Sequence, residues 1–119
     1  MDDHNITVSI EPFPSIPNLK IITITGTIDI STSKLADKKI LPVIEKGDSH
    51  VIIDLSKLDY LSSTGMMSLT TYQLRSVDKK ILLKLIKPSK SIYNTMSFFG
   101  ITKKFDMYDS LETAIKTFR

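Results

Sequence analysis

The chain has 119 residues, of which 41% are apolar and 24% charged, so it is long enough to bury one hydrophobic core and has an ordinary globular composition. It contains no cysteine, which excludes disulfides, thiolate metal sites and cysteine nucleophiles. The net charge is +3, and it is unevenly distributed: residues 1–74 contain six Lys and nine acidic residues, while residues 75–119 contain ten Lys or Arg and four acidic residues. The basic residues of the second part form no continuous block and do not alternate with stacking aromatic residues. We therefore favour a solvated or partner-facing surface over nucleic-acid binding.

The first elements form a predicted hairpin. Residues 6–10 alternate apolar and polar side chains, as a half-buried strand does. Three prolines in 12–17 exclude a helix and leave a stiff connection to residues 19–25, a β-branched run that ends at Gly26. This connection is too short for a crossover helix, so the two strands should be antiparallel.

A helix and a buried strand come next. The hydroxyls in 31–33 are candidate helix N-caps, and a loose apolar face follows them. Pro42 should kink this helix or end it early, and Gly47 should close it. Residues 50–55 form a continuous apolar run, which is typical of a strand buried on both faces.

The remaining chain alternates helices and strands. After a loop, we expect a helix at 65–75 and a buried strand at 81–86. A helix capped by Ser89 or Ser91 should end at Gly100. The last expected elements are a short strand at 105–107 and a helix capped by Asp109 or Ser110. The prediction is an α/β fold with a mixed, mostly parallel sheet, an N-terminal hairpin and about four helices.

The ends and linkers of the chain carry few signals. Residues 1–5 are acidic and lead into no apolar segment, so we expect no signal peptide. The longest apolar stretch, at 81–86, contains Lys84 and is far too short to span a bilayer. We expect a cytoplasmic protein that does not insert into a membrane, with residues 1–119 as a single domain.

Motifs for metabolic chemistry are missing from the sequence. The four glycines are far apart, so no phosphate-binding or dinucleotide loop is present. The two histidines, His4 and His50, have no ligand-spaced partners, and His50 is best read as a half-exposed strand residue. No serine elbow occurs either. We therefore expect no enzyme activity, no cofactor and no bound metal.

Three successive hydroxyls, Ser62, Ser63 and Thr64, stand out because they follow a buried strand and begin a helix. Ligands of α/β sheets bind at the carboxyl ends of strands, and a helix N-terminus favours an anion. Phosphorylation there would add about −1.5 to −2 charges. The alternative is that one of these hydroxyls is simply an N-cap, and spacing alone favours that interpretation.

Motifs spread over almost the whole chain resemble the STAS family, found in anti-sigma factor antagonists, stressosome proteins and the cytoplasmic tails of sulfate transporters. The strongest motif is Ile-Asp-Leu-Ser at 53–56 followed by Ser-Ser-Thr-Gly at 62–65. Gly-Thr-Ile-Asp at 26–29 is similar to the family's Gly-Glu-Leu-Asp, and the segments 98–101 and 109–114 resemble the family's C-terminal pattern.

The resemblance implies a protein-binding switch of the anti-sigma factor antagonist type. Thr64 takes the position of the phosphoacceptor, with Ser63 as a second acceptor. The implied partner is an anti-sigma factor with serine/threonine kinase activity, which the unphosphorylated protein binds and the phosphorylated protein releases. A phosphatase would restore binding, and ATP would belong to the partner. The expected partner-binding residues are Asp29, Ser62, Gly65, Met66 and Met67.

This chain departs from the family pattern at two positions. Ser62 stands where the family usually has Asp, and Met67 stands where many relatives carry a small residue. The change at Ser62 leaves open a non-phosphorylated STAS scaffold or accessory module, stressosome-like or lipid-transport-like. A receiver-like domain phosphorylated on Asp54 is a weaker alternative, since the first strand carries no acidic pair to hold Mg²⁺.

Overall fold

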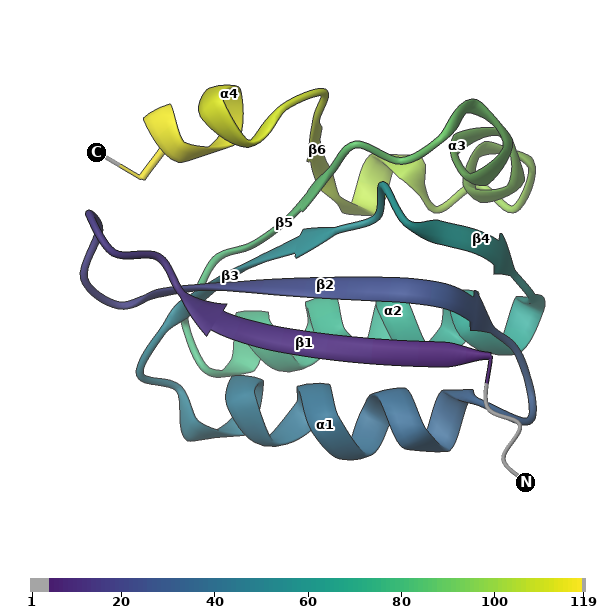
Figure 1. The fold of residues 1–119 in the computed structure, drawn as a ribbon, viewed down its shortest axis with the longest axis horizontal. Coiled ribbons are helices and arrows are strands. Elements are labelled where there is room, and N and C mark those ends of the chain that lie inside the picture. The colour runs from purple at the N-terminus through teal and green to yellow at the C-terminus, as the bar shows by residue number, and fades with distance from the viewer. Residues whose placement is uncertain (1–4, 119) are drawn as a thin grey trace.

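In the computed structural model, which describes residues 5–118, helices pack on a six-stranded mixed sheet (Figure 1). Helices α1 and α2 lie together along one face of this sheet, and α4 lies across the opposite side. The elements are β1 (Ile6–Pro12), β2 (Leu19–Ile28), α1 (Ser33–Lys46), β3 (His50–Asp54), β4 (Leu58–Leu61), α2 (Ser63–Asp78), β5 (Leu83–Ile86), α3 (Lys90–Phe98), the 3₁₀ turn η1 (Thr102–Lys104), β6 (Asp106–Tyr108) and α4 (Leu111–Lys116).

The strand order is β1-β2-β3-β5-β6, and β4 pairs with β2 beyond the end of β3. Only β1 and β2 are antiparallel, in register from Ile6 opposite Gly26 to Pro12 opposite Lys20. The pairs β2–β3, β2–β4, β3–β5 and β5–β6 are all parallel. The predicted N-terminal hairpin and the mostly parallel α/β sheet with four α-helices are therefore confirmed.

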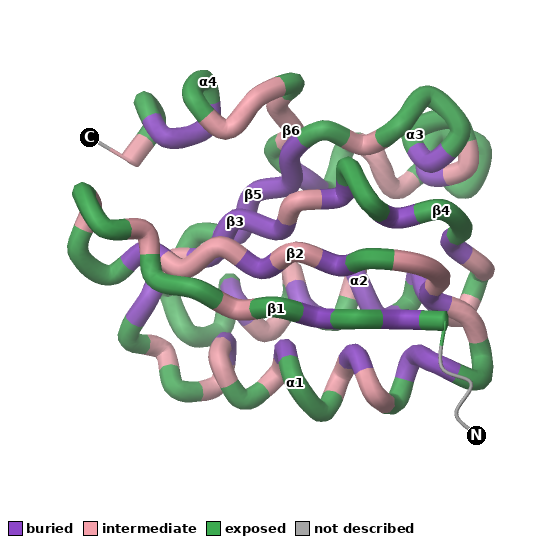
Figure 2. The backbone as a smooth tube through the Cα atoms, viewed as in Figure 1, coloured by how far each residue is buried: buried purple, intermediate pink, exposed green. Residues whose placement is uncertain are grey.

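Buried residues lie on both faces of the sheet, and β3 and β5 form its centre (Figure 2). The larger core lies between the sheet and helices α1, α2 and α3, and includes Ile22, Ile40, Leu69 and Met96. The smaller core lies under α4 and the proline-rich connection, and includes Ile52 and Ile86. Since β3 and β5 contact both cores, they are buried on both faces, as their largely apolar runs predict.

Tyr72 of α2 shows how the two long helices are joined. Its ring is fully buried, and its hydroxyl donates a hydrogen bond of 2.6 Å to Asp37 Oδ1 of α1. Burial raises the pKa of Tyr72, and the Asp37 carboxylate adds to the effect, so the phenol keeps its proton. The pair satisfies the polar atom of a large core side chain, as burial requires.

Lys84 is the buried charge of the smaller core, with 7% of its surface exposed. Its ammonium donates to Thr117 Oγ1 at 2.9 Å and lies 5.1 Å from the centroid of the Phe118 ring and 5.4 Å from that of Tyr108. These contacts join β5 to β6 and to the end of α4. Lysine within the apolar run 81–86 is thus a packing residue.

The structure corrects two predictions. Helix α1 does not end early at Pro42 but continues to Lys46, where Gly47 caps it in a left-handed conformation. Pro42 is exposed, so water can solvate the carbonyl that loses its backbone donor. The predicted loop before α2 contains the strand β4, whose ends Leu58 and Leu61 are buried while its two middle residues are exposed.

No helix within residues 5–118 combines the length and the apolar character needed to cross a membrane.

Candidate functional site

The N-terminus of α2 lies against the end of β2, and Ser62 makes the junction. The Ser62 backbone N–H donates to the Ile28 carbonyl at 3.0 Å, and its hydroxyl contacts the same carbonyl at 3.2 Å. The Ser62 Oγ also accepts from the Gly65 N–H at 3.1 Å. Ser62 is therefore the N-cap of α2, the role that the sequence left open among the three hydroxyls.

Ser63 and Thr64 are the first two residues of α2, so both candidate phosphoacceptors lie in its first turn. Ser63 is exposed and Thr64 is half-buried. Residues 60–74 contain no charged side chain, so the positive end of the helix dipole meets no carboxylate from its own first turn. An added phosphate would be favoured there by the N-terminal N–H groups and by the dipole.

Gly65 and Met66 are buried, whereas Met67 is 69% exposed. A Cβ at Gly65 would lie 2.6 Å from the Ile28 carbonyl oxygen and 2.7 Å from Leu61 Cδ1. Glycine is needed here because α2 approaches the β2 backbone so closely. The position is explained by packing, and its direct contact with a partner stays a prediction, as does that of Met66.

Asp29 begins the loop between β2 and α1, one residue after the carbonyl that anchors Ser62. Its Oδ1 accepts from the Ser31 hydroxyl at 2.7 Å, the Ser31 N–H at 2.9 Å and the Thr32 N–H at 3.1 Å. The Ser31 hydroxyl is the largest cause lowering the pKa of Asp29 below 3.8; burial opposes it, and the two N–H groups add to it. A fixed carboxylate thus lies in the loop next to the α2 cap.

Ile30, beside Asp29, is a residue that sequence reasoning missed. Its side chain is 80% exposed at the tip of the same loop. Tyr60 of β4, the strand that pairs with the end of β2, is 56% exposed. Exposed apolar patches with a polar rim mark protein-binding surfaces, and Ile30 and Tyr60 are candidate members of such a patch. In the sequence, Ile30 could have been noticed as a single isoleucine between Asp29 and the hydroxyl residues Ser31 and Thr32.

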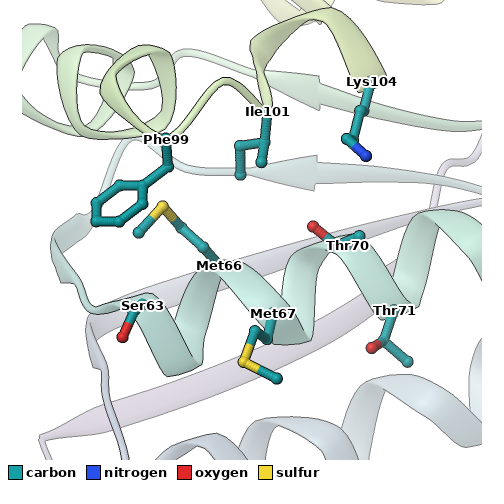
Figure 3. Close-up of a pocket in the computed structure, with 8 residues that line it drawn as sticks. All are labelled: Ser63, Met66, Met67, Thr70, Thr71, Phe99, Ile101 and Lys104. Carbon is teal, nitrogen blue, oxygen red and sulfur yellow. The ribbon is translucent and has the colours of Figure 1, made fainter.

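A groove of about 450 Å³ begins at Ser63 and runs along α2 (Figure 3). In Figure 3 the Met66 side chain is directed toward Phe99, while Lys104 lies at the end of the groove distant from Ser63. Its other wall is the segment from the end of α3 through η1. The lining residues are Ser63, Met66, Met67, Thr70, Thr71, Phe99, Ile101 and Lys104. Phe99, which follows the last residue of α3, is 52% exposed at this groove.

The structure also brings together the Asp54 and Lys87 of the receiver-like alternative, with 3.7 Å between Lys87 Nζ and Asp54 Oδ2. Glu11, the acidic residue at the end of β1, lies elsewhere. Because β1 is antiparallel, Glu11 pairs with Ile21, which lies opposite Ile52 in the middle of β3 and not opposite Asp54 at its carboxyl end. Within residues 5–118 no three His, Asp or Glu side chains gather as metal ligands would.

His50 has a structural role. Its Nδ1 accepts from the Leu82 N–H at 2.9 Å, and its ring packs against Phe118 with 5.6 Å between ring centroids. The residue is half-exposed in β3, as its position in the sequence predicts.

Several proteins are similar to this chain over most of its length. The protein BtrV of Bordetella bronchiseptica, named as a candidate anti-sigma factor antagonist, is 27% identical over 107 residues, which cover 87% of this chain and 90% of that protein. The crystal structure of an anti-sigma factor antagonist from Mycobacterium paratuberculosis superposes with a TM-score of 0.84 and 21% identity, covering 96% of this chain and 94% of the other.

The Bacillus cell fate determinant SpoIIAA in its phosphorylated form superposes with a TM-score of 0.71 and 18% identity, covering 95% of this chain and 100% of that one. Its unphosphorylated form gives a TM-score of 0.76 at 18% identity, covering 93% and 95%. The profile of the STAS domain matches residues 12–114, nearly the whole chain. Together with the α/β sheet and the Ser-Ser-Thr-Gly turn at the start of α2, this match shows that the chain belongs to the STAS domain family.

Proposed function

We propose that this protein is an anti-sigma factor antagonist whose binding is switched by phosphorylation at the start of α2. The observation that carries the proposal is the uncharged first turn of α2, where an exposed Ser63 and a half-buried Thr64 follow the Ser62 cap. The similarity to BtrV and to SpoIIAA, which has been solved with and without phosphate, supports the same assignment.

In the unphosphorylated state, the surface around this turn docks on an anti-sigma factor that is also a serine/threonine kinase. Met67 and Ile30 supply exposed apolar contacts there, and Asp29 supplies a fixed negative charge. Held in this way, the anti-sigma factor is kept from its sigma factor. The kinase partner binds ATP, and this chain contributes only the acceptor hydroxyl.

Phosphorylation ends the docking through charge. A phosphate adds about −1.5 to −2 charges and three acceptor oxygens. The helix N-terminus tolerates this group, but an apolar partner surface would have to desolvate it. Asp29 adds a like charge in the neighbouring loop, so an acidic partner group would be repelled further. A phosphatase reverses the step.

Thr64 is the first candidate acceptor, by its position before Gly65, and Ser63 is the second. The Ser62 hydroxyl is the N-cap, and its bonds to Ile28 and Gly65 argue against it as an acceptor. We place the protein in the cytoplasm, where such a kinase and phosphatase act, and treat residues 1–119 as one functional unit.

Phosphorylation with the cognate kinase tests the acceptor. The anti-sigma factor would be isolated by affinity capture from native lysate and incubated with this protein and ATP. Intact mass and peptide mapping should detect one phosphoryl group, lost in Thr64→Ala or, if Ser63 is the acceptor, in Ser63→Ala. No phosphorylation by any captured kinase would contradict the switch.

Charge substitution tests the mechanism. Thr64→Glu should weaken binding to the anti-sigma factor at least about tenfold, since a carboxylate in the first turn imitates part of the phosphate charge. Leu74→Glu is the matched control, because Leu74 is exposed on the same helix nearly three turns further on. The affinity of this variant for the anti-sigma factor should stay within about twofold of wild type. Equal affinities of Thr64→Glu and wild type, measured by calorimetry, would contradict the proposal.

A second function, a STAS scaffold that is never phosphorylated, is favoured by one observation. Ser62 replaces the usual acidic residue before the acceptor, and its side chain serves as a cap. The scaffold predicts stable partner binding that neither the kinase nor Thr64→Glu alters, so the same two experiments separate the functions.

A further inference from the structure

Besides the candidate phosphorylation site, the surface near Ser63 has a second feature, the groove between α2 and the α3–η1 segment. Met67 and Phe99 border it with 69% and 52% of their surface exposed, while the buried Met66 and the half-buried Ile101 line it more deeply. Gln73 Nε2 donates to the Lys104 carbonyl at 3.1 Å, which joins the far wall to α2. The groove is thus an open and mainly apolar depression of the surface.

The charge at the groove comes from lysine. Residues 60–74, which include its α2 wall, carry no charged side chain, and Lys104 is the one charged residue among those that line it. Lys104 lines the groove, and Lys103 is exposed beside it. The complement of this surface is an apolar segment that carries acidic residues at the Lys104 end.

The shape of the groove favours a helical segment. One wall is helix α2, and the other is the turn from Phe99 to the 3₁₀ segment η1. The backbone groups of α2 are engaged within the helix, so an added strand would find no sheet edge to pair with. Methionines adapt to different apolar anchors, and about 450 Å³ holds several such side chains. The anchors of an amphipathic helix, spaced at i, i+3, i+4 and i+7, suit an elongated groove along α2.

We infer that this groove binds an amphipathic helix of the partner protein, with its apolar face against Met66, Met67 and Phe99 and a carboxylate paired with Lys104. The inference rests on the proposed function in one respect, that the start of α2 is part of the partner surface. It adds the chemistry of the partner: an acidic helix whose acidic end lies away from Ser63. A phosphate on Ser63 would then stand at the mouth of the groove.

Two designed helical peptides test this inference on the unphosphorylated full chain. They share an apolar face of Leu and Phe and differ only in carrying Glu or Lys at the end that would meet Lys104. In heteronuclear NMR titrations, the acidic peptide should shift the methyl signals of Met66, Met67 and Ile101 and bind at least about fivefold more tightly than the basic one. Equal affinities, shifts elsewhere on the protein, or no binding by either peptide would overturn the inference.

Charge reversal supplies the matched variants. Lys104→Glu should weaken the acidic peptide at least about fivefold, because it replaces the paired cation by a like charge. Lys90→Glu makes the same charge change in the exposed first turn of α3, outside the groove lining. The affinity of this variant for the acidic peptide should stay within about twofold of wild type. Equal losses in both variants would indicate a diffuse charge effect and overturn the inference.

A third arm concerns lipid. Vesicles of phosphatidylcholine with phosphatidylserine would compete for the same lysines and for Phe98, which is 84% exposed. Binding to these vesicles without binding to the acidic peptide would assign the surface to a membrane and overturn the inference.

The two proposals fail separately. In one outcome, Thr64→Glu abolishes binding of the anti-sigma factor, while Lys104→Glu changes the affinity neither for the anti-sigma factor nor for the acidic peptide. The phosphorylation switch then stands and the groove assignment falls. If Lys104→Glu weakens the anti-sigma factor but Thr64→Glu does not, the groove assignment stands and the switch falls.

Discussion

At Gly65 a single missing methyl group sets how closely α2 can approach β2. Glycine inside a helix normally costs about 0.5–1 kcal/mol relative to alanine. In Gly65→Ala the added Cβ would lie 2.6 Å from the Ile28 carbonyl oxygen, so backbone must move. Overpacking of this kind costs about 1–3 kcal/mol, and the clash should outweigh the gain in helix propensity.

We therefore expect Gly65→Ala to lower the free energy of unfolding by about 1–2 kcal/mol in urea titrations, and to shift the methyl signals of Ile28 and Leu61. Gly100→Ala is the control because a Cβ added there would meet no atom within 4 Å, although its φ of +74° still makes alanine strained. Gly100→Ala should leave those methyl signals in place. A stabilising effect of Gly65→Ala would contradict such close packing of α2 on β2.

Asp29 connects the chemistry of the candidate site to pH. The Ser31 hydroxyl, with the N–H groups of Ser31 and Thr32, lowers the pKa of Asp29 in the folded protein below 3.8. Its contribution to stability is therefore present above pH 3.8 and is lost as the pH falls through the lower, folded pKa. Asparagine keeps an acceptor oxygen but has no charge to lose.

Wild type should be more stable than Asp29→Asn at pH 7, and the difference should close as the pH falls through the lowered pKa of Asp29 in the folded protein. Urea midpoints measured from neutral to acidic pH check this. Asp59→Asn, which changes an exposed carboxylate on β4, controls for the general effect of removing a charge. A wild-type advantage that stayed constant over this pH range would show that Asp29 acts through its shape alone.

At the scale of elements, the sequence predicted those whose side-chain pattern is strong. The alternation in 6–10 and the apolar runs around β3 and β5 led to the correct strands. Strand β4 was missed because four residues with buried ends and exposed middle residues show neither alternation nor a continuous apolar run. Its pairing with β2 depends on a contact across about thirty residues, which no local pattern reports.

The candidate site was predictable only in part for the same reason. The hydroxyls at 62–64 could be located at a helix start, but all three are good N-caps, and the bond from Ser62 to Ile28 selects one of them. The groove was not predictable, because Met67 and Phe99 are far apart in sequence and line one groove only after the chain around η1 has packed against α2.

At Pro42, tertiary packing prevails over the local tendency of proline to end a helix. Proline removes the N–H that would donate to the Lys38 carbonyl, at a cost of about 3 kcal/mol in a rigid helix. Helix α1 nevertheless continues for another turn, because Ile40 and Ile44 are both fully buried in the larger core. Tertiary packing therefore keeps the helix intact past the proline.

Pro42→Ala should raise the free energy of unfolding by about 1–2 kcal/mol, since the restored hydrogen bond outweighs the greater freedom of the unfolded chain. Urea titration measures the change. Lys39→Ala, at an exposed position of the same helix, should stay within about 0.5 kcal/mol of wild type. A loss of stability in Pro42→Ala would mean that the proline ring itself makes a needed contact.

At the scale of the molecule, the proposed switch lies at one end of the sheet. The elements that support it are held by contacts that a local charge change does not require to break. The start of α2 is anchored to β2 through Ser62 and Gly65, while Tyr72 anchors the middle of the same helix to α1. A rigid support of this kind confines an added charge to the surface that carries it. Two routes could end partner binding, a local charge effect or unfolding of the helix, and they differ in what stability should do.

If the charge acts locally, Thr64→Glu should melt at or slightly above the temperature of wild type, because a carboxylate in the first turn is favoured by the helix dipole by about 0.3–1 kcal/mol. Val77→Glu places the same charge at an exposed position in the last turn of α2, where the dipole disfavours it, and should melt slightly lower. Circular dichroism melts of the three proteins at low ionic strength give the order, and added salt should bring the melting temperatures together. A Thr64→Glu protein that lost its partner and also melted well below Val77→Glu would instead point to partial unfolding of α2 as the means of release.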